Sequence, residues 1–147
     1  MMRFVLDASL FIDASRSVQK ADELRRFYEG FLPFVYLSSV VIMELLARTR
    51  RNAVRTLERN LIEPFERRRR VLTPSHAAFR SAGRVLEALG RSGLDLNRAP
   101  RRVAGDILIA TSCREAGATL VTANRRDFER IRTVLSGFEH TGPWPER

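Results

Sequence analysis

Cysteine and histidine are scarce in this sequence, which limits the chemistry that it can support. Cys113 is the only cysteine, so the chain cannot form an internal disulfide, and this usage is typical of a reducing cytoplasm. Only two histidines are present. His76 stands at a predicted helix start and His140 in the C-terminal tail, and we expect both on the surface. A functional site is therefore expected to depend on other side chains.

Long hydrophobic runs are also missing. No apolar stretch approaches the roughly 18–20 residues that span a bilayer. The first run, Phe4–Leu6, is too short for the hydrophobic region of a secretory signal, and Asp7 interrupts it. With 147 residues the chain can bury a core without cross-links. We therefore expect one domain over residues 1–147, located in the cytoplasm and not in a membrane.

Acidic residues are outnumbered, which leaves a formal net charge of +9. Such an excess favours polyanionic partners, nucleic acid above all, because cationic side chains neutralise phosphates. Lys20 is the only lysine among the 26 basic residues. A GC-rich coding bias explains that skew as well as selection for arginine does, so only the net charge supports nucleic acid. The run Arg67–Arg70 follows Glu63 and Glu66 and is expected to be a solvated face.

Short apolar segments alternate with amphipathic ones along the chain. Strands are predicted at residues 3–6, 36–37, 71–72 and 119–122. Helices are predicted over residues 40–47, 51–62, about 75–90, 103–116 and, for a single turn, 128–131. Pro64 marks the end or a kink of the second helix, and residues 95–102 are expected to form a loop. This alternation predicts an α/β fold, a three-layer α/β/α sandwich with a mostly parallel central sheet.

Four carboxylates lie on or beside these apolar elements. Two of them, Asp7 and Asp127, follow predicted strands, and Glu44 and Asp106 lie in apolar helical segments. Burying an ionised carboxylate costs several kcal/mol or more unless a cation compensates it. We therefore interpret the four acids as one metal site. Oxygen ligands alone select hard cations such as Mg²⁺ or Mn²⁺, and such ions suit phosphodiester hydrolysis.

Each acid also has a structural alternative. Asp7 could cap the next helix through neighbouring amides. Glu44 could face solvent, although its neighbours are apolar. Asp106 could be a favourable acid in the first turn of a helix. Asn124 and Asp127 could form an Asx-turn and a helix cap.

The same residues carry a resemblance to the PIN-domain family, and within it to the VapC-like toxin ribonucleases of toxin–antitoxin systems. The matching segments are Val5–Ser9, Ser38–Leu45, Gly105–Ala110 and Leu120–Phe128. Their order and spacing fit over roughly residues 3–135. A hydrophobic strand that ends in aspartate is common, so no single segment would be specific.

The resemblance implies a metal site formed by Asp7, Glu44, Asp106 and Asp127, with Ser9 and Asn124 as supporting residues. It also implies a PIN-like fold, a homodimer and inhibition by a cognate antitoxin protein. Arginines near the site are candidate phosphate ligands. They are Arg101, Arg102, Arg125 and Arg126, with Arg98 nearby in sequence.

We therefore expect a Mg²⁺- or Mn²⁺-dependent endoribonuclease that hydrolyses RNA with activated water. Two alternatives remain open from the sequence. One is a catalytically inactive PIN-like module that binds RNA or protein, and the other is a metal-dependent DNA nuclease or phosphatase. Two further expectations concern packing: Cys113 as a small core residue, and Trp144 as a packing anchor or part of a disordered end.

Overall fold

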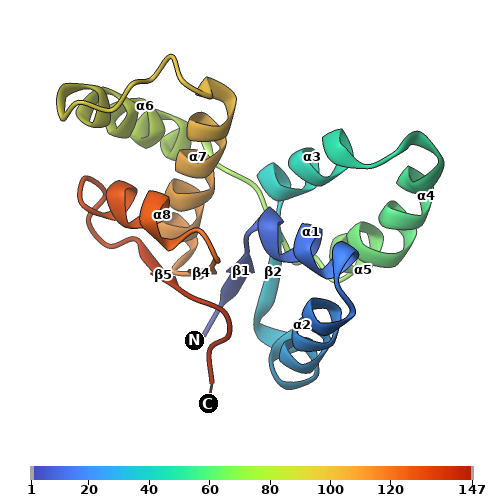
Figure 1. Ribbon diagram of the computed structural model, residues 1–147. Coiled ribbons are helices and arrows are strands. Elements are labelled where there is room, and N and C mark those ends of the chain that lie inside the picture. The colour runs from blue at the N-terminus through green and yellow to red at the C-terminus, as the bar shows by residue number, and fades with distance from the viewer. Residues whose placement is uncertain (1, 147) are drawn as a thin grey trace.

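A five-stranded sheet forms the centre of the computed structural model, which describes residues 2–146 (Figure 1). Its strands are β1 (Phe4–Leu6), β2 (Val35–Ser38), β3 (Val71–Leu72), β4 (Thr119–Val121) and β5 (Glu139–Thr141). They lie in the order β3-β2-β1-β4-β5, and every pair is parallel. The predicted α/β fold with a parallel sheet is confirmed.

Helices cover both faces of this sheet. Before β3 come α1 (Ala8–Arg16), α2 (Val18–Phe31), α3 (Ser39–Arg48), α4 (Val54–Leu57) and α5 (Glu63–Arg67), with a 3₁₀ turn, η1 (Leu32–Phe34), leading into β2. After it come α6 (His76–Arg91), α7 (Pro100–Ala116) and α8 (Arg125–Arg132). The order of strands reverses after β3, and right-handed crossovers then place the two sets on opposite faces. Figure 1 shows α6, α7 and α8 grouped apart from α1–α5.

Local sequence explains most of these boundaries. All three residues of β1 are buried, as expected for a parallel strand covered on both faces. Ser38 caps α3 by accepting from the amides of Val40 and Val41, and Ser75 caps α6 by accepting from the Ala78 amide. Gly117 ends α7 in the left-handed conformation, with φ at 65°.

Three predictions about helices and loops are wrong. The single turn predicted over 128–131 is longer, because α8 runs from Arg125 to Arg132. The predicted loop over 95–102 is too long, because α7 begins at Pro100, a residue favoured in a first helical turn where no backbone donor is needed. The predicted helix over 51–62 is not regular. It consists of a 3₁₀ turn, η2 (Arg51–Ala53), then α4, and then a π-helical turn, η3 (Glu58–Ile62). The Glu63 amide bonds to the Glu58 carbonyl, five residues back, and the helical path continues through Pro64 into α5.

The C-terminal segment differs most from expectation. No strand is predicted at 139–141, because Glu139, His140 and Thr141 form no apolar run, yet they pair with β4 as an edge strand. The prediction of a surface His140 is wrong: its side chain is 3% exposed, because α8 packs against β5. Its Nε2 lies 2.7 Å from Glu129 Oε2.

Two packing expectations are settled by the fold. Cys113 is fully buried in the core, as predicted. Trp144 is the anchor rather than a disordered end, since its ring stacks on Phe27 with centroids 5.0 Å apart.

His76 is exposed, as expected. Among residues 2–146, no helix is both long enough and apolar enough to cross a membrane.

Candidate metal centre at the carboxyl ends of the strands

The predicted site lies where the strand order reverses. From β1 the chain proceeds to β2 and β3 on one side, and β4 pairs with β1 on the other. Parallel α/β sheets bind ligands at the carboxyl ends of the strands that flank such a point. Asp7 follows β1 and Thr122 follows β4, and the Asp7 amide bonds to the Val121 carbonyl over 3.0 Å. The two strand ends are therefore joined directly.

Asp7 is held by three hydrogen bonds. Its Oδ1 accepts from the Ala8 amide at 2.8 Å, and its Oδ2 accepts from Thr122 Oγ1 at 2.8 Å and from Ser9 Oγ at 3.2 Å. The side chain thus does cap α1, as the structural alternative supposed. A carboxylate offers about four acceptor positions, so one remains for a ligand. Burial raises the pKa of Asp7, whose side chain is only 6% exposed, although these hydrogen bonds and Arg102 oppose the rise.

Thr122 belongs to this site but was not among the predicted residues. It is fully buried, donates to Asp7, and accepts a hydrogen bond from the Asn124 amide at 2.9 Å. The signal in the sequence was a hydroxyl residue at the end of an apolar strand. That signal is weak by itself, because threonine is common in strands.

Glu44 is half-buried in the middle of α3 and faces α7. A Cβ atom added to Gly105 would lie 3.1 Å from Glu44 Oε1, so the absence of a side chain at Gly105 makes room for this carboxylate. The pKa of Glu44 is raised, first by burial and then by the charge of Asp7, while Arg48 and Arg102 lower it. The solvent-facing alternative therefore does not describe Glu44.

Asp106 carries the strongest sign of crowding. It is the seventh residue of α7, so the alternative of an acid in the first helical turn is wrong. Burial raises its pKa to about 7, and the charges of Asp7, Glu44 and Asp127 add to the rise, while Arg102 opposes it. The other three acids thus act on Asp106 electrostatically, and a cation placed beside it would relieve this repulsion.

Asp127 lies at the edge of the group, in the first turn of α8, and its side chain is 42% exposed. Its Oδ2 accepts from Asn124 Nδ2 at 3.0 Å and lies 3.6 Å from Arg102 Nη2. Asn124 occupies the N-cap position of α8 but makes no side-chain capping bond. Its amide group contacts Asp127 instead, which differs from the Asx-turn and cap alternative.

Residues 4–134 match the PIN domain family, which is most of the chain. The chain belongs to the PIN-domain family. A curated relative, the tRNA(fMet)-specific endonuclease VapC of Shigella flexneri, is 30% identical over 133 residues, which cover 89% of this chain and 93% of that protein.

Solved structures agree with this assignment. A DNA-bound VapBC from Salmonella typhimurium matches with a TM-score of 0.71 and 25% identity, over 97% of this chain and 98% of that one. VapBC-1 from nontypeable Haemophilus influenzae shares the fold with a TM-score of 0.69 at 18% identity, over 96% and 98% of the two chains. The prediction of a VapC-like PIN-domain endonuclease is confirmed.

The donor set of this PIN domain fits a hard cation. All four candidate ligands are carboxylates, and Asp7, which accepts three internal hydrogen bonds, still has one acceptor position left. Within residues 2–146, no group of three or more acidic, histidine or cysteine side chains lies in positions that could hold a metal ion as the side chains stand. The other three acids lie close enough to Asp106 to raise its pKa, and oxygen ligands of this kind suit Mg²⁺ or Mn²⁺.

The predicted phosphate-binding arginines divide into two groups. Arg102 and Arg126 line a cavity of about 700 Å³ beside Asp106 and Asp127, together with Arg98. Arg101 does not line it, and neither does Arg125, whose Cδ lies 3.2 Å from the position of a Cβ on Gly142.

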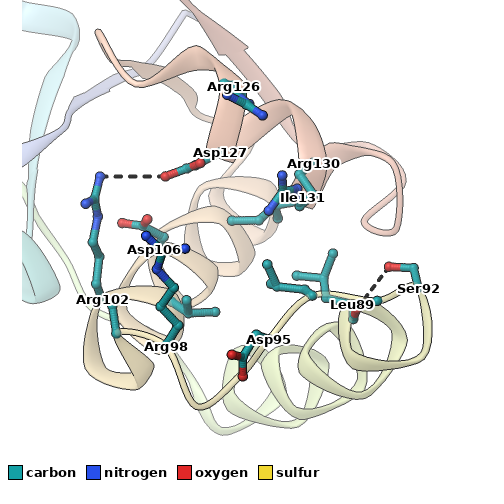
Figure 2. Close-up of a pocket in the computed structure, with 14 residues that line it drawn as sticks. Leu89, Ser92, Asp95, Arg98, Arg102, Asp106, Arg126, Asp127, Arg130 and Ile131 are labelled. Carbon is teal, nitrogen blue, oxygen red and sulfur yellow. Dashed lines mark hydrogen bonds and ion pairs between the residues drawn. The ribbon is translucent and has the colours of Figure 1, made fainter.

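Arg130 also lines the cavity and was not predicted. It lies four residues after Arg126, and this spacing places both side chains on one face of α8. Figure 2 shows Arg126 and Arg130 on one side of the cavity and Arg98 and Arg102 on the other.

Proposed function

We propose that this PIN-domain protein is a Mg²⁺- or Mn²⁺-dependent endoribonuclease and the toxin of a toxin–antitoxin pair. The observation that carries the proposal is the placement of four carboxylates at the reversal point of a parallel sheet, where Asp7, Glu44 and Asp127 all lie close enough to Asp106 to act on its charge. In this proposal Asp7, Glu44, Asp106 and Asp127 hold the metal, and the core over residues 3–135 forms one nuclease domain. The chemistry that such an ion supplies is activation of water as a nucleophile and neutralisation of charge on the phosphate.

The protein's own residues prepare this site in three ways. Thr122 and Ser9 fix the Asp7 carboxylate by hydrogen bonds to Oδ2, which keeps it from rotating. Asn124 orients Asp127. Arg102 pairs with Asp127 and lowers the pKa of the other three acids, so it favours the ionised forms that bind metal.

RNA is the proposed substrate on two grounds. The net charge of +9 favours a polyanion, and the cavity beside Asp106 presents four arginines that can bind phosphates. The relative named as a tRNA(fMet)-specific endonuclease supports RNA, and transfer RNA in particular.

The proposal extends to partners. The similarity to a VapBC from Salmonella typhimurium over nearly the whole chain supports a cognate antitoxin protein as the inhibitor. We also propose that the protein is a homodimer. Size measurement in solution, with and without the protein encoded beside it, would test both statements.

The test of the activity is cleavage of purified transfer RNA by the full-length protein with Mg²⁺ or Mn²⁺, with and without EDTA. We expect cleavage that EDTA abolishes and that Asp7→Asn reduces by at least about 100-fold, because the variant keeps the shape of the side chain but loses its charge. Asp22→Asn, on the exposed part of α2, is the matched control for charge loss and for contaminating nuclease.

Equal amounts of single-stranded DNA and of a phosphate monoester, assayed beside the RNA, separate the alternative activities. Cleavage that survives both EDTA and Asp7→Asn would contradict the metal-dependent mechanism. Binding of RNA without any cleavage would favour the inactive module.

A further inference from the structure

The cavity beside the candidate metal centre combines two kinds of surface. Its rim carries four arginines, and its interior includes the apolar side chains of Leu89, Leu94, Val103 and Ile131. Leu89 and Ile131 belong to the hydrophobic core and are almost fully buried, so the floor is rigid. Figure 2 shows Leu89 across the cavity from Asp106 and Asp127, and Ile131 beside Arg130.

Most arginines of this rim form no ion pair within the described part of the chain, although Asp95, Asp106 and Asp127 line the same cavity. Arg102 pairs with Asp127, but among residues 2–146 no carboxylate lies within 4.0 Å of the guanidinium groups of Arg98, Arg126 or Arg130. All three are exposed. Cations that border an apolar floor and have no acidic partner are suited to a ligand that is both anionic and aromatic.

From the lining and the charge of this cavity we propose that it binds one nucleotide of the RNA substrate next to the cleaved bond. The base lies against the partly exposed side chains of Leu94 and Val103, above the buried Leu89 and Ile131, and arginines of the rim bind the adjoining phosphates. This inference rests on the proposed function, because it assigns a substrate contact to the same enzyme.

Size and position favour a nucleotide over an acidic peptide. A volume of about 700 Å³ lies within the range of roughly 300–1,000 Å³ usual for ligand sites and accommodates a base with its ribose. Asp106 and Asp127 line both the cavity and the candidate metal centre, so the cavity is continuous with the place where a phosphodiester would be cut. A strand held at the metal centre would therefore pass directly into it.

The test is binding of a short, fluorescently labelled single-stranded RNA to the Asp7→Asn protein, which is used so that the strand stays intact. Versions of the RNA with a single abasic position are compared with the complete strand. We expect one position at which loss of the base weakens binding about tenfold, because the base no longer buries apolar surface against the floor. In Val103→Phe, whose larger ring occupies part of the surface on which the base lies, that penalty should become clearly smaller.

The arginines give a second, independent readout. Arg98→Ala and Arg130→Ala should each weaken RNA binding and reduce the slope of log affinity against log salt by about 0.7, the value for one phosphate contact on a single strand. Arg84→Ala, on the exposed face of α6 and outside the cavity, is the matched control and should change neither quantity. These two exposed arginines keep the proposal testable if Val103→Phe does not fold.

The inference is overturned if the abasic penalty is absent or persists unchanged in Val103→Phe, or if the arginine variants match Arg84→Ala. Acidic peptide that competes for the cavity while the base-dependent signal is absent would indicate a protein ligand instead. Failure of the proposed function looks different: metal-dependent cleavage by the wild-type protein would be missing while the base-dependent binding remained.

Discussion

The Thr122 hydroxyl donates to Asp7 Oδ2 over 2.8 Å and so connects the ends of two adjacent parallel strands, β4 and β1. Both residues are buried, and the Thr122 oxygen also accepts from the Asn124 amide. One hydroxyl group thereby orients the central acid and also fixes the start of the loop that leads to Asp127. This contact links the geometry of the sheet to that of the candidate metal centre.

Thr122→Val tests that contact. The variant keeps the branched shape but removes the donor, so Asp7 loses a hydrogen bond that lowers its pKa. We expect affinity for Mn²⁺ to fall about 10–100-fold, as is typical when a residue that orients a ligand is lost. Unfolding in urea should show a loss of about 1–2 kcal/mol. Thr122→Ser retains the hydroxyl and should restore most of the metal affinity; equal affinity in the valine and wild-type proteins would contradict this role.

Gly105→Ala separates stability from function. Alanine is favoured over glycine inside a helix by about 1 kcal/mol, but the new Cβ would approach Glu44 Oε1 to 3.1 Å. Because the carboxylate is the end of a flexible side chain, we expect Glu44 to move and the fold to survive. Thermal unfolding should show no loss of stability, while Mn²⁺ affinity and RNA cleavage fall at least about fivefold.

The matched control for this substitution is Gly83→Ala in α6, where a Cβ would meet nothing within 4 Å. It should raise stability by about 0.5–1 kcal/mol and leave cleavage unchanged. If Gly105→Ala behaves in the same way as Gly83→Ala in both measurements, Glu44 is not part of the site.

Asp106 makes the stability of the metal-free protein depend on pH. Its pKa is about 7 in the folded protein against an ordinary 3.8, so between these values the unfolded chain has released a proton that the folded protein retains. The contribution of this group to stability is therefore complete below about pH 4 and is lost as the pH rises through 7. Near pH 3.5 in EDTA, the carboxyl of Asp106 is neutral in the folded protein, so its charge should cause no difference in stability between wild type and Asp106→Asn.

At pH 8 in EDTA, Asp106→Asn should be more stable than wild type by about 1–3 kcal/mol, because it no longer carries the buried charge. Added Mn²⁺ should raise the melting temperature of wild type far more than that of the variant. Urea unfolding across pH 4–8 measures the difference, and a gap that shrinks as the pH rises would contradict the assignment.

Arg102 should determine the pH below which the rate of RNA cleavage falls, which is the acid limb of the pH–rate profile. It lowers the pKa of Asp7, Glu44 and Asp106, so Arg102→Gln should raise all three and shift the acid limb to higher pH. Arg102→Lys should shift it less, and Arg84→Gln not at all. If Arg102→Gln lowers the cleavage rate by the same factor at every pH and leaves the acid limb at the same pH, Arg102 acts only by binding RNA.

Much of the fold was predictable because parallel strands buried on both faces must be apolar throughout. Phe4–Leu6 has that pattern, as do Leu120 and Val121, and the serine caps mark the helix starts at Ser38 and Ser75. The edge strand β5 was missed because an edge strand needs no continuous apolar run. The burial of His140 was missed because α8 covers it only in the folded protein, which the residues around His140 do not indicate.

The candidate site shows the same limit. Asp7, Glu44 and Asp106 were identifiable because acids within apolar segments are costly to bury. Thr122 and Arg130 were not, since a strand threonine and one arginine among many have no distinctive setting until the sheet and α8 bring them to the site. Arg101 and Arg125 illustrate the converse: closeness in sequence to Asp106 and Asp127 did not place them in the cavity.

Titration calorimetry with Mn²⁺ at pH 7.5 tests most directly whether the four carboxylates form one metal centre. Wild type, Asp7→Asn, Asp106→Asn and the surface control Asp22→Asn are compared, with folding of each verified by its unfolding transition. We predict saturable binding to wild type and Asp22→Asn, and a loss of more than about tenfold in affinity, or roughly 1.4 kcal/mol, in each of the other two. Equal Mn²⁺ affinity in all four proteins would contradict the account.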